Sequence, residues 1–200
     1  MNHFVTRKAQ TEDFEQVLPL TIMAIEDLAD QFTSSSDPEV IKERMLAAYT
    51  SPNTRFSKEY AVIVEAVDDN GKREVAGVGF AYPGRDMRNL TKQTIEAYQR
   101  VGATYEAEDV QRLLNSKEAQ WGEFYIDNLA VYETYRGHGL SKKILAALES
   151  EGKQQGFDRI SILADINNPK AKAIYEKMGY IPDSIYEVLE HKYHHMVKII

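Results

Sequence analysis

Two glycines one residue apart, Gly137 and Gly139, lie between an apolar stretch and an amphipathic segment that begins at Leu140. Glycine adopts backbone conformations that other residues avoid, so such a turn can direct successive N–H groups toward one point. Where the turn opens a helix, the helix dipole adds partial positive charge at that point. With the cations Arg136 and Lys142 close by, the segment is predicted to bind the phosphate groups of a ligand.

Spacing separates the phosphate loops that this turn could form. A Walker A loop requires G-x-x-x-x-G-K-[ST], and the chain contains no such string. A dinucleotide fingerprint requires G-x-G-x-x-G, and the third glycine position is occupied by Lys142. The remaining string, Arg136-Gly137-His138-Gly139-Leu140-Ser141, directly follows an apolar strand pattern and opens a helix pattern, an arrangement suited to a pyrophosphate.

The charge of the chain is unevenly distributed. The formal net charge is -7, of which residues 136–177 carry +3 and the remainder -10. A basic segment suits an anionic ligand and an acidic remainder suits a cationic one, whereas the acidic balance disfavours nucleic acid. The acid-rich stretches 25–31 and 106–109 could supply a site for a cationic acceptor, or could be solvated helix faces.

Composition bounds the kind of protein. With 200 residues, 43% of them apolar, the chain suits a single domain over 1–200. No apolar run is long enough to span a membrane, and the N-terminal sequence has no apolar core of a signal peptide. The absence of cysteine excludes disulfides, thiolate metal ligands and a cysteine nucleophile, and agrees with a cytoplasmic protein.

Apolar spacing indicates the elements that must position the loop. The first half is predicted to contain a strand at 3–9, a helix whose apolar positions run from Phe14 to Leu28, a helix after Asp37-Pro38, and a β-hairpin, 59–67 with 73–82, closed by the Asn-Gly turn. Residues 86–120 read as one or two inserted helices. The second half alternates strand 123–131, helix 140–154, strand 159–165, helix 169–178 and strands 184–188 and 191–200, which favours a mainly α/β sheet with a crossover helix.

Two ordered motifs resemble a known family. "NLAVYETYRGHGLSKKIL" resembles motif A of the GNAT superfamily of acyl-CoA N-acyltransferases, [RQ]-x-x-G-x-[GA], with Arg136 and Gly139 matching and Ser141 where glycine or alanine is usual. "NPKAKAIYEKMGY" resembles motif B of that family. Its matching positions are Asn168, Ala171, Tyr175, Glu176, Lys177 and Gly179. With the strand between them, the motifs span residues 123–182.

The resemblance implies a fold and a cofactor site. The expected GNAT fold is α/β (α+β), a mixed, mostly antiparallel sheet of about seven strands flanked by helices, with strands four and five splayed and the 86–120 insert added. Acetyl-CoA would lie in the splay. The implied cofactor contacts are Leu129, Ala130, Val131, Arg136, Gly137, His138, Gly139, Leu140, Ser141, Asn168, Ala171 and Tyr175.

The resemblance also implies the catalytic groups. Tyr175 would be the general acid for the leaving thiolate, although a helix aromatic packed on the sheet is the alternative reading. The base would lie on strand 123–131, where strict alternation places Glu123, Tyr125, Asp127 and Leu129 on one face. Asp127 is the first candidate, with Tyr125 and Glu123 behind it, and a purely structural Asp127 remains open. No metal site is expected, because His191, His194 and His195 do not share one face of a strand and no third ligand is evident.

The resulting expectation is an acetyl-CoA-dependent N-acetyltransferase that transfers acetyl directly to a primary amine. A small, cationic acceptor such as a polyamine is favoured by the acidic remainder. A protein lysine or N-terminal acetyltransferase and a non-catalytic acyl-CoA-binding module are the alternatives. Homodimers are common among such proteins, so a homodimer is an open alternative to a monomer.

Overall fold

The computed structural model describes residues 3–200, and its sheet has seven strands in the order β1-β2-β3-β4-β5-β7-β6. The strands are β1 His3–Lys8, β2 Ala61–Val67, β3 Arg73–Pro83, β4 Phe124–Val131, β5 Arg159–Asp165, β6 Ile181–Val188 and β7 His191–Ile199. Among the strands of residues 3–200, β4 and β5 alone pair in parallel, and every other pair of neighbours is antiparallel. This mixed, mostly antiparallel sheet is the expected fold.

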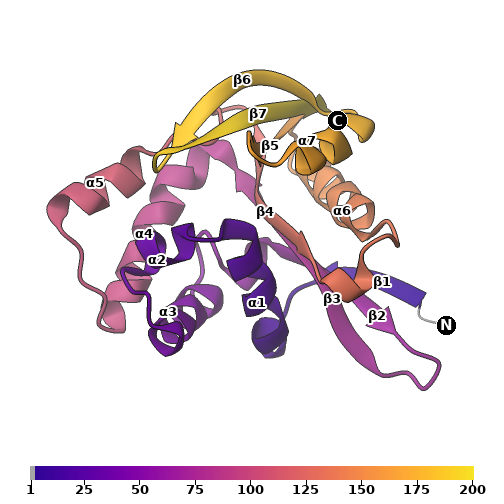
Figure 1. The fold of residues 1–200 in the computed structure, drawn as a ribbon, viewed down its shortest axis with the longest axis horizontal. Coiled ribbons are helices and arrows are strands. Elements are labelled where there is room, and N and C mark those ends of the chain that lie inside the picture. The colour runs from indigo at the N-terminus through magenta and orange to yellow at the C-terminus, as the bar shows by residue number, and fades with distance from the viewer. Residues whose placement is uncertain (1–2) are drawn as a thin grey trace.

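Helices cover both faces of the sheet (Figure 1). They are α1 Phe14–Ile25, α2 Leu28–Thr33, α3 Pro38–Thr50, α4 Met87–Arg100, α5 Ala107–Asn115, α6 Leu140–Gln154 and α7 Pro169–Lys177. Residues of α1 to α5 share one apolar core with β2 and β3, whereas α6 and α7 pack in a second core on the opposite face. The crossover helix predicted between strands four and five is therefore α6.

Local signals explain where several helices begin. Asp37 caps α3 by accepting a hydrogen bond from the Glu39 N–H at 2.9 Å, and Pro38 takes the first helical position. The Asn168 side chain caps α7 in the same way, with Pro169 following.

The long first helix predicted from Phe14 to Leu28 is wrong. The chain leaves the helical conformation at Glu26, whose φ is 51°, and restarts as α2 at Leu28. Apolar spacing continues across the break because both pieces bury residues in the same core, so periodicity alone could not show it.

The insert forms two helices, α4 and α5, and α4 is an integral part of the core. Leu90 and Tyr98 of α4 are almost completely buried, and the Tyr98 hydroxyl lies 3.0 Å from the Met45 sulfur of α3. Between residues 3 and 200, no helix is long and apolar enough to cross a membrane.

Candidate active site

The sheet opens between β4 and β5. The two strands are paired from Phe124–Ile160 to Ile126–Ile162, and beyond this point they line opposite walls of a cleft of about 930 Å³. Leu129, Ala130 and Val131 lie on the β4 side. A volume of this size lies in the range of ligand-binding clefts. The splay expected between strands four and five is therefore present, and it forms this cleft.

The glycine turn forms one end of this cleft. Gly137 and Gly139 have φ angles of 82° and 72°, a left-handed conformation that favours glycine, and no atom lies within 4 Å of the position that a Cβ would take at either residue. Within residues 3–200, the backbone N–H groups of 137–141 make no hydrogen bond to another residue. The turn and the first residues of α6 therefore present free donors beside open space, which fits a pyrophosphate.

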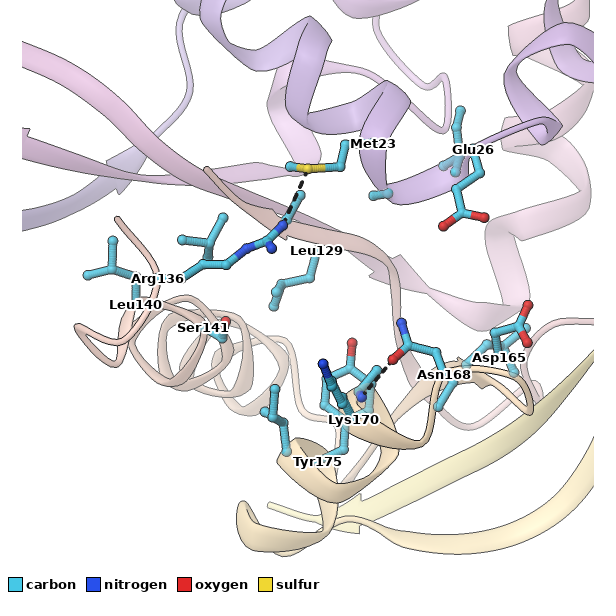
Figure 2. A pocket seen from close by; sticks show the side chains of 18 of the residues that line it. Met23, Glu26, Leu129, Arg136, Leu140, Ser141, Asp165, Asn168, Lys170 and Tyr175 are labelled. Carbon is cyan, nitrogen blue, oxygen red and sulfur yellow. Dashed lines mark hydrogen bonds between the residues drawn. The ribbon is translucent and has the colours of Figure 1, made fainter. Parts of the chain in front are cut away.

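Charged side chains of both signs line the cleft, including Lys142 and Lys170. Figure 2 shows Arg136 with Leu140 and Ser141 on one side of the cleft, and Glu26 with Asp165 on the other. The Arg136 side chain reaches across to the Met23 sulfur of α1, 3.7 Å from its Nη2 atom. A ligand with phosphates at one end and a cationic or neutral group at the other matches this distribution.

Three other residues predicted to contact the cofactor differ in how they face the cleft. Asn168 and Ala171 line the cleft, and the Asn168 Oδ1 accepts a hydrogen bond from the Ala171 N–H at 3.0 Å, which leaves the Asn168 Nδ2 for a ligand. His138 is exposed and does not line the cleft; its ring packs on Phe4 with 5.4 Å between centroids. For His138, it is therefore the backbone and not the side chain that could contact a phosphate.

Tyr175 of α7 lies where the large cleft meets a second, smaller cavity of about 110 Å³. Its side chain is largely buried, and burial raises the pKa of the Tyr175 phenol to about 12. No hydrogen bond joins its hydroxyl to another residue between 3 and 200. Tyr175 is thus a protonated donor available to a ligand in either cavity.

The smaller cavity contains a buried ion-pair network that the sequence did not suggest. Arg55 is 2% exposed and donates to the Asp127 carboxylate at 2.9 and 2.7 Å and to the Glu118 carboxylate at 2.8 and 2.7 Å. Asp127 also accepts from the Tyr82 hydroxyl at 2.7 Å, and Glu118 from the Tyr125 hydroxyl at 2.9 Å. One cation is therefore shared by two carboxylates, which leaves the cavity with a net negative charge.

A β-bulge at Asp127 changes which side chains face this cavity. Phe80 of β3 pairs with Asn128 and Ala81 pairs with Ile126, so Asp127 is the extra residue. The prediction that Leu129 shares a face with Tyr125 and Asp127 is therefore wrong. Beyond the bulge, Leu129 lies opposite Gly79 on the α6 side of the sheet, and Asn128 takes the face of Tyr125 instead.

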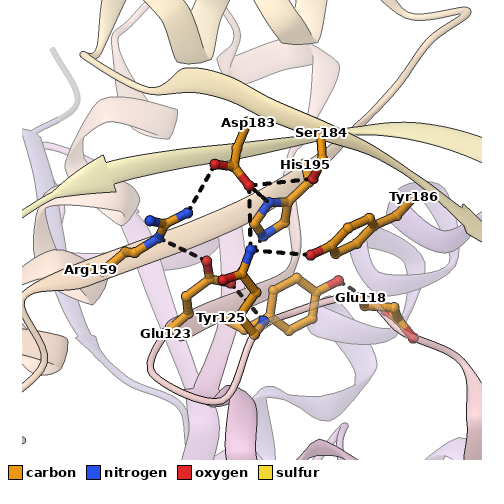
Figure 3. A network of polar contacts seen from close by, with 9 residues as sticks. Glu118, Glu123, Tyr125, Arg159, Asp183, Ser184, Tyr186 and His195 are labelled. Atoms are coloured by element: carbon orange, nitrogen blue, oxygen red, sulfur yellow. Dashed lines mark hydrogen bonds and ion pairs between the residues drawn. The ribbon is translucent and has the colours of Figure 1, made fainter.

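Glu123 lies outside both cavities, ahead of β4 (Figure 3). Its carboxylate contacts the His195 Nε2 at 3.0 Å and accepts from the Arg159 Nε at 2.9 Å. Burial alone would raise the pKa of Glu123, but hydrogen bonds from His195 and the Gln120 N–H, with the charge of His195, lower it to about 2. This network joins β4, β5 and β7 away from the cleft.

Arg55 and Glu118 were missed because no local pattern marks them. Arg55 precedes β2 in an irregular segment, and Glu118 follows α5 in the loop that leads to β4. The two meet only in the folded chain, 63 residues apart in sequence. A single Arg between Thr54 and Phe56, outside any helix or strand pattern, gives no spacing signal that sequence reasoning could use.

A seven-stranded sheet opened between its fourth and fifth strands, with a glycine turn at the start of the following helix, defines the GNAT class of acetyltransferases. The chain belongs to that family, because the family model described as "Acetyltransferase (GNAT) family" matches residues 24–180.

Related proteins agree with this assignment. N-alpha-acetyltransferase 30 of Saccharomyces cerevisiae is 39% identical over 57 residues, which are 28% of this chain and 32% of that protein. An uncharacterized N-acetyltransferase of Bacillus subtilis, YycN, is 34% identical over 58 residues, 29% of this chain and 37% of that protein. The matches thus span about a third of the length of these curated relatives.

The whole chain resembles solved structures in fold. A crystal structure of an N-acetyltransferase from Staphylococcus aureus Mu50 has a TM-score of 0.73 at 24% identity, covering 96% of this chain and 99% of that one. A second structure, described as an acetyltransferase, has a TM-score of 0.76 at 23% identity, covering 98% and 99%.

Proposed function

We propose that this chain is an acetyl-CoA-dependent N-acetyltransferase that transfers acetyl directly to a primary amine. The observation that carries the proposal is that the two cavities share lining residues, among them Leu129, Tyr175 and Tyr193. The cleft runs from the free N–H groups of the glycine turn to Tyr175, where the smaller cavity with its carboxylates begins. A CoA-linked acetyl group and an amine would enter from opposite sides and meet there.

Different residues would carry out different parts of the reaction. The backbone of 129–131 would align the pantetheine arm and thioester, while the turn holds the pyrophosphate. Attack by the neutral amine nitrogen forms the C–N bond and breaks the C–S bond, and the electron pair leaves on sulfur. The Tyr175 hydroxyl, protonated because burial raises its pKa, would donate a hydrogen bond to that sulfur.

We give Asp127 a different role from that of a free catalytic base. Its two oxygens already accept hydrogen bonds from Arg55 and Tyr82, so both are engaged as acceptors. We assign it, with Glu118, to attracting the acceptor's ammonium form into the smaller cavity. Tyr125 would act through its hydrogen bond to Glu118. Glu123 would stabilise the start of β4 from a position outside both cavities.

The acceptor of this proposal is a small, cationic amine, supported by the acidic residues Glu26, Asp27 and Asp165 that line the cleft. An acceptor amine on a protein, either lysine or an N-terminus, is the second candidate. One solved relative in fold was described in a complex bound to a peptide and CoA, and another as an agmatine N-acetyltransferase, so the fold accommodates both kinds.

Thiol release from acetyl-CoA across an amine panel tests the proposal. The panel contains a polyamine, a neutral amino compound, a lysine peptide blocked at its N-terminus and a peptide with a free N-terminus. Because the chain has no cysteine, every thiol detected comes from CoA. We expect acceptor-dependent release; tight acetyl-CoA binding by calorimetry with no release from any amine would instead support a non-catalytic binding module.

A further inference from the structure

Asn128 has a buried amide with no partner. Its side chain is 5% exposed, and within residues 3–200 neither its Nδ2 nor its Oδ1 makes a hydrogen bond. Leaving a buried donor and acceptor unsatisfied costs free energy that an apolar side chain of the same shape would avoid. Such a group in the middle of a core strand needs an explanation, and a ligand that completes both bonds supplies one.

The β-bulge directs this amide to the acceptor side of the site. Asn128 pairs with Phe80 and lines the smaller cavity beside Asp127, and the same cavity is lined by Tyr175. At about 110 Å³, the cavity accommodates one end of an acceptor rather than a whole ligand. The group that contacts Asn128 is therefore close to the amine that reacts.

The charged groups in the cavity are already engaged. Four hydrogen bonds run from Arg55 to Asp127 and Glu118, so its guanidinium has one N–H left of five. Burial alone would raise the pKa of Glu118, but the charge and hydrogen bonds of Arg55 hold it below its usual value. Asp127 already accepts hydrogen bonds from Arg55 and Tyr82. Apart from the hydroxyls of Tyr175 and Tyr193, Asn128 is the uncharged polar side chain that remains, and it offers both a donor and an acceptor.

A site whose carboxylates already accept hydrogen bonds from Arg55 favours an amine that is easily deprotonated. An α-amine with a pKa of about 7.8 is neutral in roughly one molecule in seven at pH 7, whereas an alkylamine with a pKa of about 10.4 is neutral in about one in 2,500. An amine next to an amide carbonyl is of the first kind. Its N–H and the adjacent carbonyl oxygen also point to the same side, which matches the paired acceptor and donor of an Asn side chain.

We propose that the smaller cavity binds an α-amino amide, and that Asn128 is its specificity-determining residue. The Asn128 Oδ1 accepts from the reacting amine, and Nδ2 donates to the carbonyl of the neighbouring amide. A free amino acid is excluded because its carboxylate would be buried next to Asp127 and Glu118. This inference rests on the proposed acetyl transfer, in which the neutral amine nitrogen gains the acetyl group and loses one proton, the thioester C–S bond breaks, and the CoA sulfur takes up one proton to leave as the thiol.

The same chemistry has two sources, a free amino-acid amide and the N-terminus of a peptide. The acceptors to compare are alaninamide, a tetrapeptide that begins with alanine, free alanine, and an alkylamine of alaninamide's size without the carbonyl. For the wild-type protein we expect alaninamide or the tetrapeptide to exceed both other amines in kcat/KM by about tenfold or more, the ratio that one well-placed hydrogen bond supports. Whichever of the two is faster identifies the source.

Asn128→Leu, which keeps the size of the side chain, should lower kcat/KM for the amide about tenfold or more and bring it to that of the alkylamine. The KM for acetyl-CoA should stay within about twofold, since Asn128 does not line the cofactor cleft. Asn128→Asp is the isosteric second variant, which loses the donor and should show the same loss of preference. Ser161→Ala is the matched control: Ser161 is buried on β5 but lines neither cavity, so the preference should persist.

The outcomes distinguish failure of this inference from failure of the proposed acetyl transfer. If the wild-type protein releases thiol but does not prefer the α-amino amide, or if both Asn128 variants retain the preference, the inference is wrong and the acetyl transfer stands. If no amine releases thiol, the proposed function fails and the inference fails with it.

Discussion

Replacing Tyr175 with phenylalanine tests the chemistry at the junction of the two cavities. The phenol has a pKa of about 12, and a typical thiol has one of about 8.5. Complete proton transfer from Tyr175 to the departing thiolate is therefore unfavourable by about 5 kcal/mol. We conclude that the hydroxyl acts by donating a hydrogen bond to the charge that develops on sulfur.

The size of that effect follows from the strength of a hydrogen bond to a charged group, about 1.5 to 3 kcal/mol. Because this bond is stronger in the transition state than in the bound thioester, its loss should lower kcat by roughly 10- to 150-fold. The KM for acetyl-CoA should hardly change. The melting temperature should also be nearly constant, since the hydroxyl makes no hydrogen bond to the rest of the described chain.

Tyr180 offers a matched control for Tyr175→Phe. The two rings are 6.1 Å apart, but the Tyr180 hydroxyl contacts Glu149 at 3.2 Å and lines neither cavity. Tyr180→Phe should keep kcat and lower only stability. Steady-state rates of CoA release at saturating amine measure both variants. An unchanged kcat in Tyr175→Phe, or an equal loss of kcat in Tyr180→Phe, would refute the role given to the Tyr175 hydroxyl.

Three further variants probe the loop and the two polar networks. Gly139→Ala should weaken acetyl-CoA binding by about 1 kcal/mol in calorimetry, because φ is 72° there while no atom crowds the new Cβ; undiminished affinity would count against the loop. Arg55→Met should lower the free energy of unfolding in urea by about 3 to 5 kcal/mol, since it leaves the carboxylates of Glu118 and Asp127 buried without their cation; an unchanged free energy of unfolding would contradict the network. Glu123→Gln should lower the melting temperature at pH 7. Because the folded pKa of Glu123 is about 2, below its usual 4.5, the carboxylate stabilises the fold above pH 4.5, and the difference from wild type should shrink as pH falls toward 2; a pH-independent difference would exclude this linkage.

The elements that depend on local sequence could be predicted well. The hairpin of β2 and β3 follows from its Asn-Gly turn and alternating residues, and α7 from Asn168 followed by proline. The break at Glu26 escaped prediction because apolar spacing continues through it. In that segment the requirements of the shared core, rather than helix propensity, determine where the chain bends.

The same distinction between local and long-range sequence signals applies to the candidate site. The glycine turn and Tyr175 lie in contiguous motifs, so the resemblance of those motifs to the GNAT family sufficed to predict them at one cleft, and both line it. Arg55 and Glu118 come from separate segments and could not be paired from sequence. Asn128 was hidden by the assumption of strict alternation along β4, which a single bulged residue overturns.

The most direct test of the central claim, direct acetyl transfer from acetyl-CoA to an amine, counts both products of one reaction. The wild-type protein is mixed with acetyl-CoA and alaninamide, and CoA thiol and acetylated amine are measured together over time, with intact-protein mass spectrometry on the same samples. We predict equal amounts of the two products and no acetylated protein on the reaction path. Thiol release without acetylated amine, or an acetylated protein that forms and decays at the rate of product formation, would contradict direct transfer.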